Sequence, residues 1–214
     1  MIGQLTPSGS ILSSVASRMN VWRELQKAST RGDSPWRNIT RMAETGIFKP
    51  DERVELIRGV VRRMSPKNYA HVVAATKLHQ RLMKSLAGRA SVFKGDPLKL
   101  VRLDSEPEPD ILAISSPDIE DYGKESSRPL LVIEVAESSL RYDLNAKAPV
   151  YAEANVPEYW VLNLVDRELV VFRSPKEGDY RERATYRSGD RVAPEAWPDV
   201  VMEVSELFPT PEPS

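Results

Sequence analysis

The stretch LLVIEVAESSL, residues 130–140, constrains the fold of this chain more than any other. Four consecutive aliphatic residues are followed by Glu134 and then by two small apolar residues. A strand with one exposed face alternates apolar and polar residues, so an unbroken apolar run predicts a strand covered on both faces. Glu134 should therefore be at least partly buried. Because an isolated buried carboxylate is costly, it must be paired with a cation, protonated or bound to a metal, and each option requires partners elsewhere in the chain.

Composition indicates an ordinary globular protein with one folded domain. The 214 residues are 41% hydrophobic and 29% charged, which allows a sizeable core. Cysteine is absent, which excludes disulfides, thiolate zinc sites and cysteine nucleophiles. No apolar run approaches the ~20 residues that span a bilayer, and the start MIGQLTPSGS lacks the layout of a secretory signal. We therefore expect no membrane partner and a cytoplasmic location. The net charge of −1 decides nothing about nucleic acid.

The chain divides into an extension, a domain and a tail. Residues 1–35 form the extension, which ends near the breaker cluster TRGDSPW and carries apolar residues at a spacing that predicts one amphipathic helix. The domain covers residues 36–208. The tail, residues 209–214, contains three prolines and little to bury, which predicts disorder.

The pattern within the domain predicts a mixed sheet flanked by helices, an α/β or α+β fold. A short helix is expected in ITRMAETGIF, a hairpin in ERVELIRGVVRRM with its turn at Arg58-Gly59, and a longer helix over residues 71–89. Further expected elements are strands near 98–103, 109–114 and 130–137, a helix over about 143–155 and a hairpin over 158–173.

A second acid on an apolar strand offers Glu134 a partner. In PEPDILAI, period-two alternation places Asp110 on one face with Leu112 and Ile114. If the two strands are neighbours, two carboxylates converge, and a cation between them offsets their repulsion. Oxygen-only ligands favour Mg²⁺ or Mn²⁺. The structural alternatives are that Asp110 caps a turn, and that Glu134 pairs with an arginine such as Arg128 or Arg141.

Two further candidates are weaker. Glu55 also lies in an apolar strand context, where a salt bridge to a neighbouring arginine is the competing explanation. His71 begins the long helix and could contact a phosphate or a metal-bound water, although a helix residue without chemistry fits equally well. The sequence contains no serine-hydrolase elbow, Walker loop or dinucleotide glycine fingerprint.

Three segments together carry a family resemblance: GIFKPDERVELIRGVVRRMSP followed by a histidine, then SEPEPDILAI, then LLVIEVAESSLRYDLNAKAPVYAEANVPEYWVLNL. From about Ile39 to Phe208 the chain resembles the Uma-type family of restriction-endonuclease-like proteins, a branch of the PD-(D/E)XK nuclease superfamily. The resemblance implies a restriction-endonuclease-like core and Mg²⁺-dependent hydrolysis of DNA. Asp110 and Glu134 would be the metal ligands, and Glu55 and His71 match positions where the family has an acid and a histidine.

One position departs from the superfamily pattern. The lysine expected two residues after the acid is replaced by Ala136, and similar nucleases supply it from the following helix, where Lys147 lies. The resemblance favours a catalytic role for Lys147. An i, i+4 ion pair with Asp143 on an exposed helix face is the structural alternative.

The expected partner is DNA, held through its phosphates by basic residues near the site, and a homodimer would allow cleavage of both strands. These basic residues are Arg58, Arg62, Arg63 and Lys67. Two other functions stay open: a nuclease-like fold that no longer cuts and serves as a DNA-binding or protein-interaction module, and a metal-dependent hydrolase of small phosphoesters.

Overall fold

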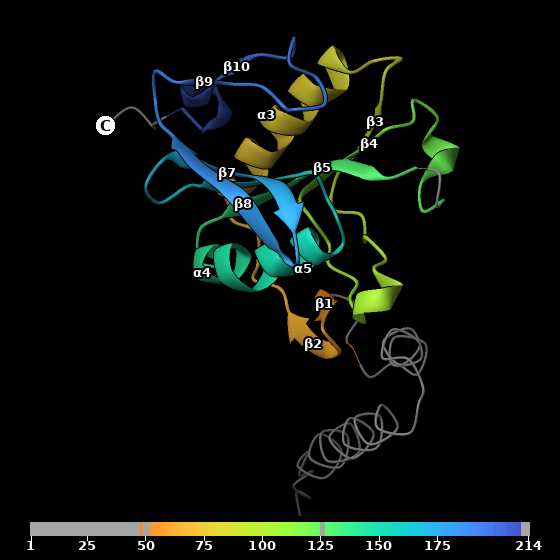
Figure 1. Cartoon of the computed structure of the whole chain (residues 1–214). Coiled ribbons are helices and arrows are strands. Elements are labelled where there is room, and N and C mark those ends of the chain that lie inside the picture. Colours follow the sequence, from red (N-terminus) through yellow and green to blue (C-terminus); the bar gives the residue numbers. More distant parts are fainter. Residues whose placement is uncertain (1–47, 49–51, 125–126, 211–214) are drawn as a thin grey trace, which may run out of the picture.

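A mixed six-stranded sheet forms the centre of the molecule, in the order β3-β4-β5-β6-β7-β8 (Figure 1). The structure, a computed structural model, describes residues 48, 52–124 and 127–210. Within the sheet β5 and β6 pair in parallel, and all other neighbours are antiparallel. The strands are β3 (Ser91–Phe93), β4 (Ile111–Ile114), β5 (Pro129–Ala136), β6 (Glu158–Asn163), β7 (Glu168–Lys176) and β8 (Asp179–Tyr186).

Helices cover both faces of this sheet. Figure 1 shows α3 (Tyr69–Ser85) on one side, together with the strands β9 (Arg191–Val192) and β10 (Met202–Glu203) and the 3₁₀ turn Val204–Leu207. The opposite side carries α4 (Leu140–Tyr142), a π-helical turn (Asp143–Lys147) and α5 (Ala148–Glu153), which follow one another without a break. The predicted mixed α+β architecture is confirmed.

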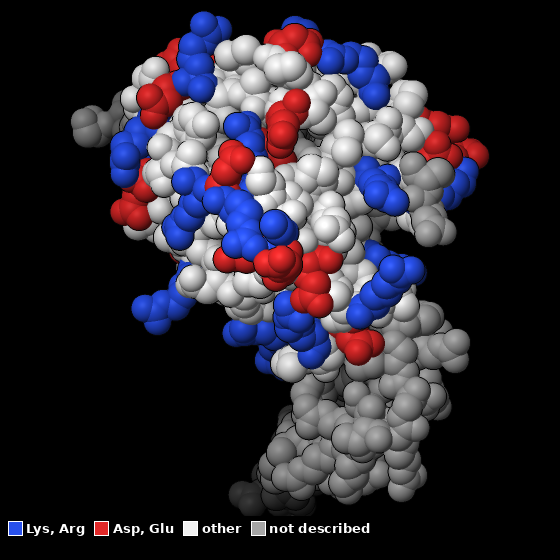
Figure 2. All heavy atoms as spheres, viewed as in Figure 1, with Lys and Arg blue, Asp and Glu red and all other residues white. Residues whose placement is uncertain are grey.

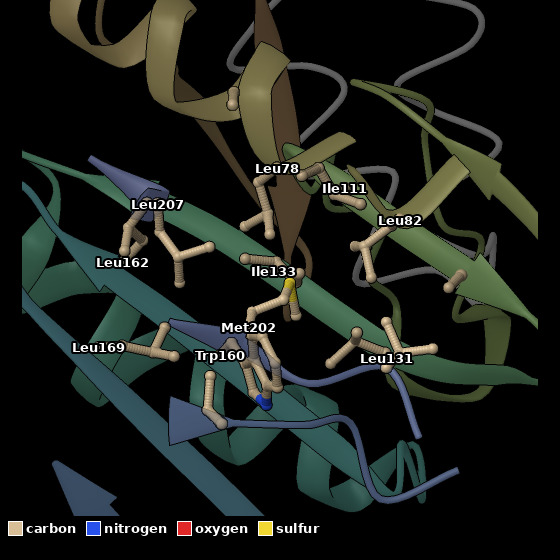
Figure 3. Close-up of a cluster of buried hydrophobic side chains, with 14 of the residues drawn as sticks. Leu78, Leu82, Ile111, Leu131, Ile133, Trp160, Leu162, Leu169, Met202 and Leu207 are labelled. Carbon is tan, nitrogen blue, oxygen red and sulfur yellow. The ribbon is translucent and has the colours of Figure 1, made fainter. Parts of the chain in front are cut away.

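Alternating side chains along the strands fill two separate cores. Leu78 and Leu82 of α3 pack against Ile111, Leu131 and Ile133 of the sheet, as Figure 3 shows. The side chains between them point the other way and pack beneath α5. The apolar run in β5 therefore exists because both of its faces are covered.

The hairpin of β1 (Val54–Ile57) and β2 (Val60–Arg63) turns at the predicted residues. Arg58 and Gly59 have φ angles of 49° and 74°, and two central residues with positive φ match the right-handed twist of a tight hairpin. The Gly59 N–H donates to the carbonyl of Asp104 at 2.8 Å, which joins the hairpin to the loop before β4.

The predicted strand near 98–103 is wrong. Val101–Leu103 forms a 3₁₀ turn instead, and Asp104 follows it with a left-handed φ of 45°. The alternation of apolar and charged residues in this segment arises because Leu98 and Leu100 pack against the core while the chain turns. The strand β3, which the sequence did not reveal, lies before this loop.

Other expectations were tested in part. The strands at 109–114 and 130–137, the long helix and the hairpin over 158–173 are confirmed, whereas the extension helix, the helix in ITRMAETGIF and residues 211–214 of the tail lie outside the described residues. None of the described helices is long and apolar enough to cross a membrane. Figure 2 shows basic and acidic side chains interspersed over the visible face, as the net charge of −1 suggests.

Candidate active site

The pairing of β4 with β5 brings Asp110 and Glu134 to the same end of two adjacent strands. Ile111 pairs with Ile133 in antiparallel register, so the next residues outward are Asp110 and Glu134. Their side chains are only 6% and 5% exposed, and both line one pocket. The predictions that the strands are neighbours and that Glu134 is buried are confirmed.

Asp110 is held by three groups. Its Oδ2 accepts the backbone N–H of Val135 at 2.9 Å and lies 3.0 Å from Nε2 of His71. Its Oδ1 accepts from Nζ of Lys67 at 2.8 Å. Burial alone would raise the pKa of this carboxyl, but the contacts with His71 and Lys67 outweigh burial and lower the pKa to about 2. Asp110 is therefore ionised at every physiological pH.

Glu134 belongs to a buried ionic cluster around the ammonium group of Lys147. The Lys147 Nζ donates to Glu134 Oε1 at 2.9 Å and lies 3.0 Å from Glu55 Oε2 and 3.6 Å from Asp143 Oδ1. All four side chains are 5% exposed or less. The Tyr151 hydroxyl also donates to Glu134 Oε1, at 2.9 Å. One buried ammonium group thus faces three buried carboxylates.

This excess of acids shifts the protonation equilibria of the cluster. Burial, reinforced by the neighbouring carboxylates, raises the pKa of Glu134 to about 8 and that of Asp143 to about 6, although Lys147 opposes both shifts. Burial would lower the pKa of Lys147, but the three carboxylates outweigh burial and raise it. The cluster therefore keeps a positive charge on Lys147 and favours a proton on Glu134.

The cluster decides between the alternatives that the sequence left open for its members. Glu134 pairs with Lys147, not with Arg128 or Arg141, and Glu55 also pairs with Lys147 in place of a neighbouring arginine. The i, i+4 contact of Lys147 with Asp143 is present, but it is buried and accompanies the contact with Glu134.

A π-helical turn gives Lys147 its direction. The helix begins at Leu140, earlier than the predicted residue 143, and widens over Asp143–Lys147, where the Ala148 N–H donates to the carbonyl of Asp143, five residues back. Pro149 then lies in the first turn of α5, where a missing N–H is tolerated. Wide turns of this kind are frequent at functional sites.

His71 is fixed by the start of α3. Asn68 caps this helix, since its side-chain oxygen accepts the backbone N–H of His71 at 2.9 Å. The imidazole reaches the pocket and contacts Asp110, while its Nδ1 has no hydrogen-bond partner among the described residues. All five residues selected from the sequence, Glu55, His71, Asp110, Glu134 and Lys147, therefore line the same pocket.

Basic side chains surround the mouth of this pocket. Arg62, Arg63 and Lys67 line it, and the Arg62 guanidinium lies over the ring of Tyr142 at 4.0 Å. Arg58 does not line the pocket and pairs with Glu153 at 2.7 Å.

Three participants were missed from the sequence: Asp143, Tyr151 and Tyr142. Tyr151 follows Lys147 at i+4, so helical spacing was an available signal for it. The sequence suggested Asp143 only as the partner of Lys147 in an exposed ion pair, not as a buried member of the site. Tyr142, adjacent to Asp143, offered no signal.

The donor set suits a hard divalent cation in chemistry. The carboxylates of Glu55, Asp110, Glu134 and Asp143 line one pocket and supply oxygen ligands. Carboxylate oxygens are the ligands that Mg²⁺ and Mn²⁺ favour. Over the described ranges, however, no three His, Cys, Asp or Glu side chains are arranged to hold one ion.

Comparison with known proteins gives a consistent result. The profile of the Uma2 family, described as "Putative restriction endonuclease", matches residues 36–205. Among solved structures, that of "a putative nuclease belonging to DUF820 from Anabaena variabilis ATCC 29413" is similar with a TM-score of 0.61. The two chains are 14% identical over 75% of this chain and 92% of the other, so the likeness concerns the fold. No curated protein sequence matches the chain.

Proposed function

The chain belongs to the Uma2 family, and on that premise we propose that it is a metal-dependent endonuclease that hydrolyses DNA phosphodiester bonds. The observation that carries this proposal is the contact of Lys147 with Glu134 beside Asp110 in one pocket. It supports the idea that a lysine from the helix after β5 stands in for the lysine that Ala136 replaces.

Asp110 and Glu134 would hold a Mg²⁺ or Mn²⁺ ion. When bound, such an ion supplies Lewis-acid polarisation of the phosphate and a lowered pKa for a bound water. Asp110 suits this role because it is ionised at neutral pH, while Glu134 would lose its proton as the cation approached.

Lys147 would contribute a fixed positive charge, not a site of proton uptake. Its raised pKa keeps it protonated, so it can donate a hydrogen bond to water or stabilise developing negative charge. His71 lies beside Asp110, from where it would contact the scissile phosphate. Glu55 would bind a second ion or a metal-bound water through Oε1, the oxygen that Lys147 does not engage.

DNA would be held at the mouth of the pocket. Arg62, Arg63 and Lys67 lie there and can contact phosphates on either side of the scissile bond. Two copies related by a two-fold axis would place one active site at each strand of a duplex, so we propose a homodimer.

A non-cutting DNA-binding module is the second candidate, and the burial of Lys147 favours it. An ammonium group that is 4% exposed and held by three carboxylates has little freedom to reach a substrate. In that case the ionic cluster would have a structural role and no catalytic one.

Incubation of the purified protein with plasmid, single-stranded DNA, RNA and a chromogenic phosphodiester, with and without Mg²⁺ or Mn²⁺, separates these functions. We expect metal-dependent cleavage of DNA that Asp110→Asn abolishes while circular dichroism stays unchanged. Asp121→Asn is the matched control, because Asp121 also pairs with a lysine but lies outside the pocket. Cleavage by Asp110→Asn at the wild-type rate would exclude the proposed role of this carboxylate, and DNA binding without cleavage would favour the second candidate.

A further inference from the structure

The three partners of Asp110 differ in their freedom to move. The Val135 N–H belongs to the backbone of β5, and His71 is fixed in the capped first turn of α3. Lys67 lies in the loop between β2 and α3, and its side chain is 24% exposed. Of the two side-chain partners of Asp110 it is the longer and the more exposed, so it leaves most readily by rotation of its own side chain.

Lys67 also holds the oxygen that a cation would need. Asp110 Oδ2 is already engaged by two fixed groups, whereas Oδ1 is engaged by the Lys67 ammonium group at 2.8 Å. A divalent ion on Oδ1 would lie within a few ångströms of this ammonium group, and two cations at that distance repel one another strongly in a partly buried site.

We propose that Lys67 is an exchangeable cation, which competes with a divalent metal for Asp110 Oδ1 and moves to a nucleic-acid phosphate when the metal binds. This inference rests on the proposed function, because it requires a metal at Asp110. The exchange keeps Asp110 neutralised throughout and delivers a positive charge to the substrate only after the metal is in place. Lys67 is thereby a positioning residue that couples metal binding to the grip on DNA.

Lys147 does not meet these requirements. It is 4% exposed, its ammonium group is surrounded by three carboxylates, and no interaction joins it to Asp110. Arg63 lines the same pocket and is 80% exposed, but it pairs with Glu52 and not with Asp110. The exchange is therefore specific to Lys67.

Titration calorimetry of metal-stripped protein with Mn²⁺ tests the competition. We expect Lys67→Met to bind Mn²⁺ about tenfold more tightly than wild type, the order of the free energy of one hydrogen bond to a charged group. Arg63→Met, which removes a pocket charge without freeing Asp110, should change the affinity less than about twofold. Lys67→Gln provides a second variant in case Lys67→Met fails to fold.

The outcomes separate the inference from the proposed function. If wild type and Lys67→Met bind Mn²⁺ with the same affinity, the inference is overturned but the proposed function is not. If Arg63→Met gains as much Mn²⁺ affinity as Lys67→Met, the gain comes from the loss of any positive charge near the pocket, and the inference is overturned as well. Wild type that binds no Mn²⁺ overturns both the inference and the proposed metal centre.

The salt dependence of DNA binding tests the movement of the lysine. Fluorescence anisotropy with a duplex is measured in EDTA and in Ca²⁺, under conditions where a gel shows no cleavage. In EDTA, wild type and Lys67→Met should have equal slopes of log K against log salt. In Ca²⁺ the slope of wild type should be steeper by about 0.9, the value for one additional phosphate contact. Equal slopes in both conditions would overturn the transfer of Lys67 to a phosphate.

Discussion

Replacement of Lys147 by Met should destabilise the protein in a strongly pH-dependent way. The substitution keeps an apolar side chain of similar length but leaves Glu55, Glu134 and Asp143 buried without their shared ammonium group. Removal of one partner from a buried ion pair costs about 3–5 kcal/mol, because the remaining charge is uncompensated. We expect a loss of this size in the free energy of unfolding at pH 8.

The loss should shrink as the pH falls. The pKa of Glu134 is about 8 against an ordinary 4.5, and that of Asp143 is about 6 against 3.8, so the folded protein holds protons that the unfolded chain has released. Stability from such groups is present at low pH and falls as the pH rises through these intervals, by about 1.4 kcal/mol per proton and pH unit. Without Lys147 both pKa values rise further, which steepens the decline. At pH 5, where Glu134 and Asp143 are neutral, the loss should be smaller than at pH 8, because the ammonium group then compensates fewer negative charges.

Urea denaturation in EDTA at pH 5 and pH 8, followed by circular dichroism and by the fluorescence of the buried Trp160, measures both values. Lys124→Met is the control, because Lys124 pairs with Asp121 at 2.7 Å on an exposed surface and its removal should change the stability little at either pH. A Lys147→Met protein that loses the same free energy at both pH values would show that lost packing, not charge, is responsible, and an unchanged stability would refute the reasoning entirely.

Two further predictions concern the same cluster. Lys147→Ala should lower the rate of DNA hydrolysis at least ~10²-fold with little change in DNA affinity by anisotropy, as expected for loss of a transition-state contact. The assay is made at a temperature where the circular dichroism of the variant matches that of wild type, and near-normal cleavage would leave Lys147 with a structural role only. In thermal denaturation, saturating Mg²⁺ should raise Tm more at pH 8 than at pH 6, because Glu134, with a pKa of about 8, must release a proton to bind the ion. Equal Tm shifts at both pH values would exclude this coupling of metal binding to the loss of a proton.

The sequence was most informative where a residue type did not match its neighbours, such as a carboxylate within an apolar segment. Glu134 in an apolar run required a buried partner, and Asp110 at the start of a second apolar strand offered one, so the two acids suggested that β4 and β5 are neighbours. Period-two alternation then indicated on which face of its strand each acid lies. The turn at Arg58-Gly59 could likewise be predicted, because Gly59 accepts a positive φ without a steric penalty and lies between two apolar segments of strand length.

The remaining features depend on contacts between distant parts of the chain, which the spacing of residues along the sequence does not reveal. The 3₁₀ turn at Val101–Leu103 carries an alternating pattern typical of a strand, and only the surrounding contacts turn the chain there. Asp143 and Lys147 are compatible with an exposed helical ion pair, and only tertiary packing buries them against Glu134. The contact of Lys67 with Asp110 joins residues 43 positions apart through a loop, for which no local pattern exists.

The π-helical turn at Asp143–Lys147 acts as a one-residue insertion in the helix. A regular α-helix closes its hydrogen bonds four residues back, whereas this turn closes one five residues back, so it takes up one additional residue while the helical segments on either side keep their arrangement. In an alignment with relatives that have a regular helix here, the equivalent lysine should therefore be sought one position away, across a gap, and a comparison without gaps would score this residue as lost when its location in space is unchanged.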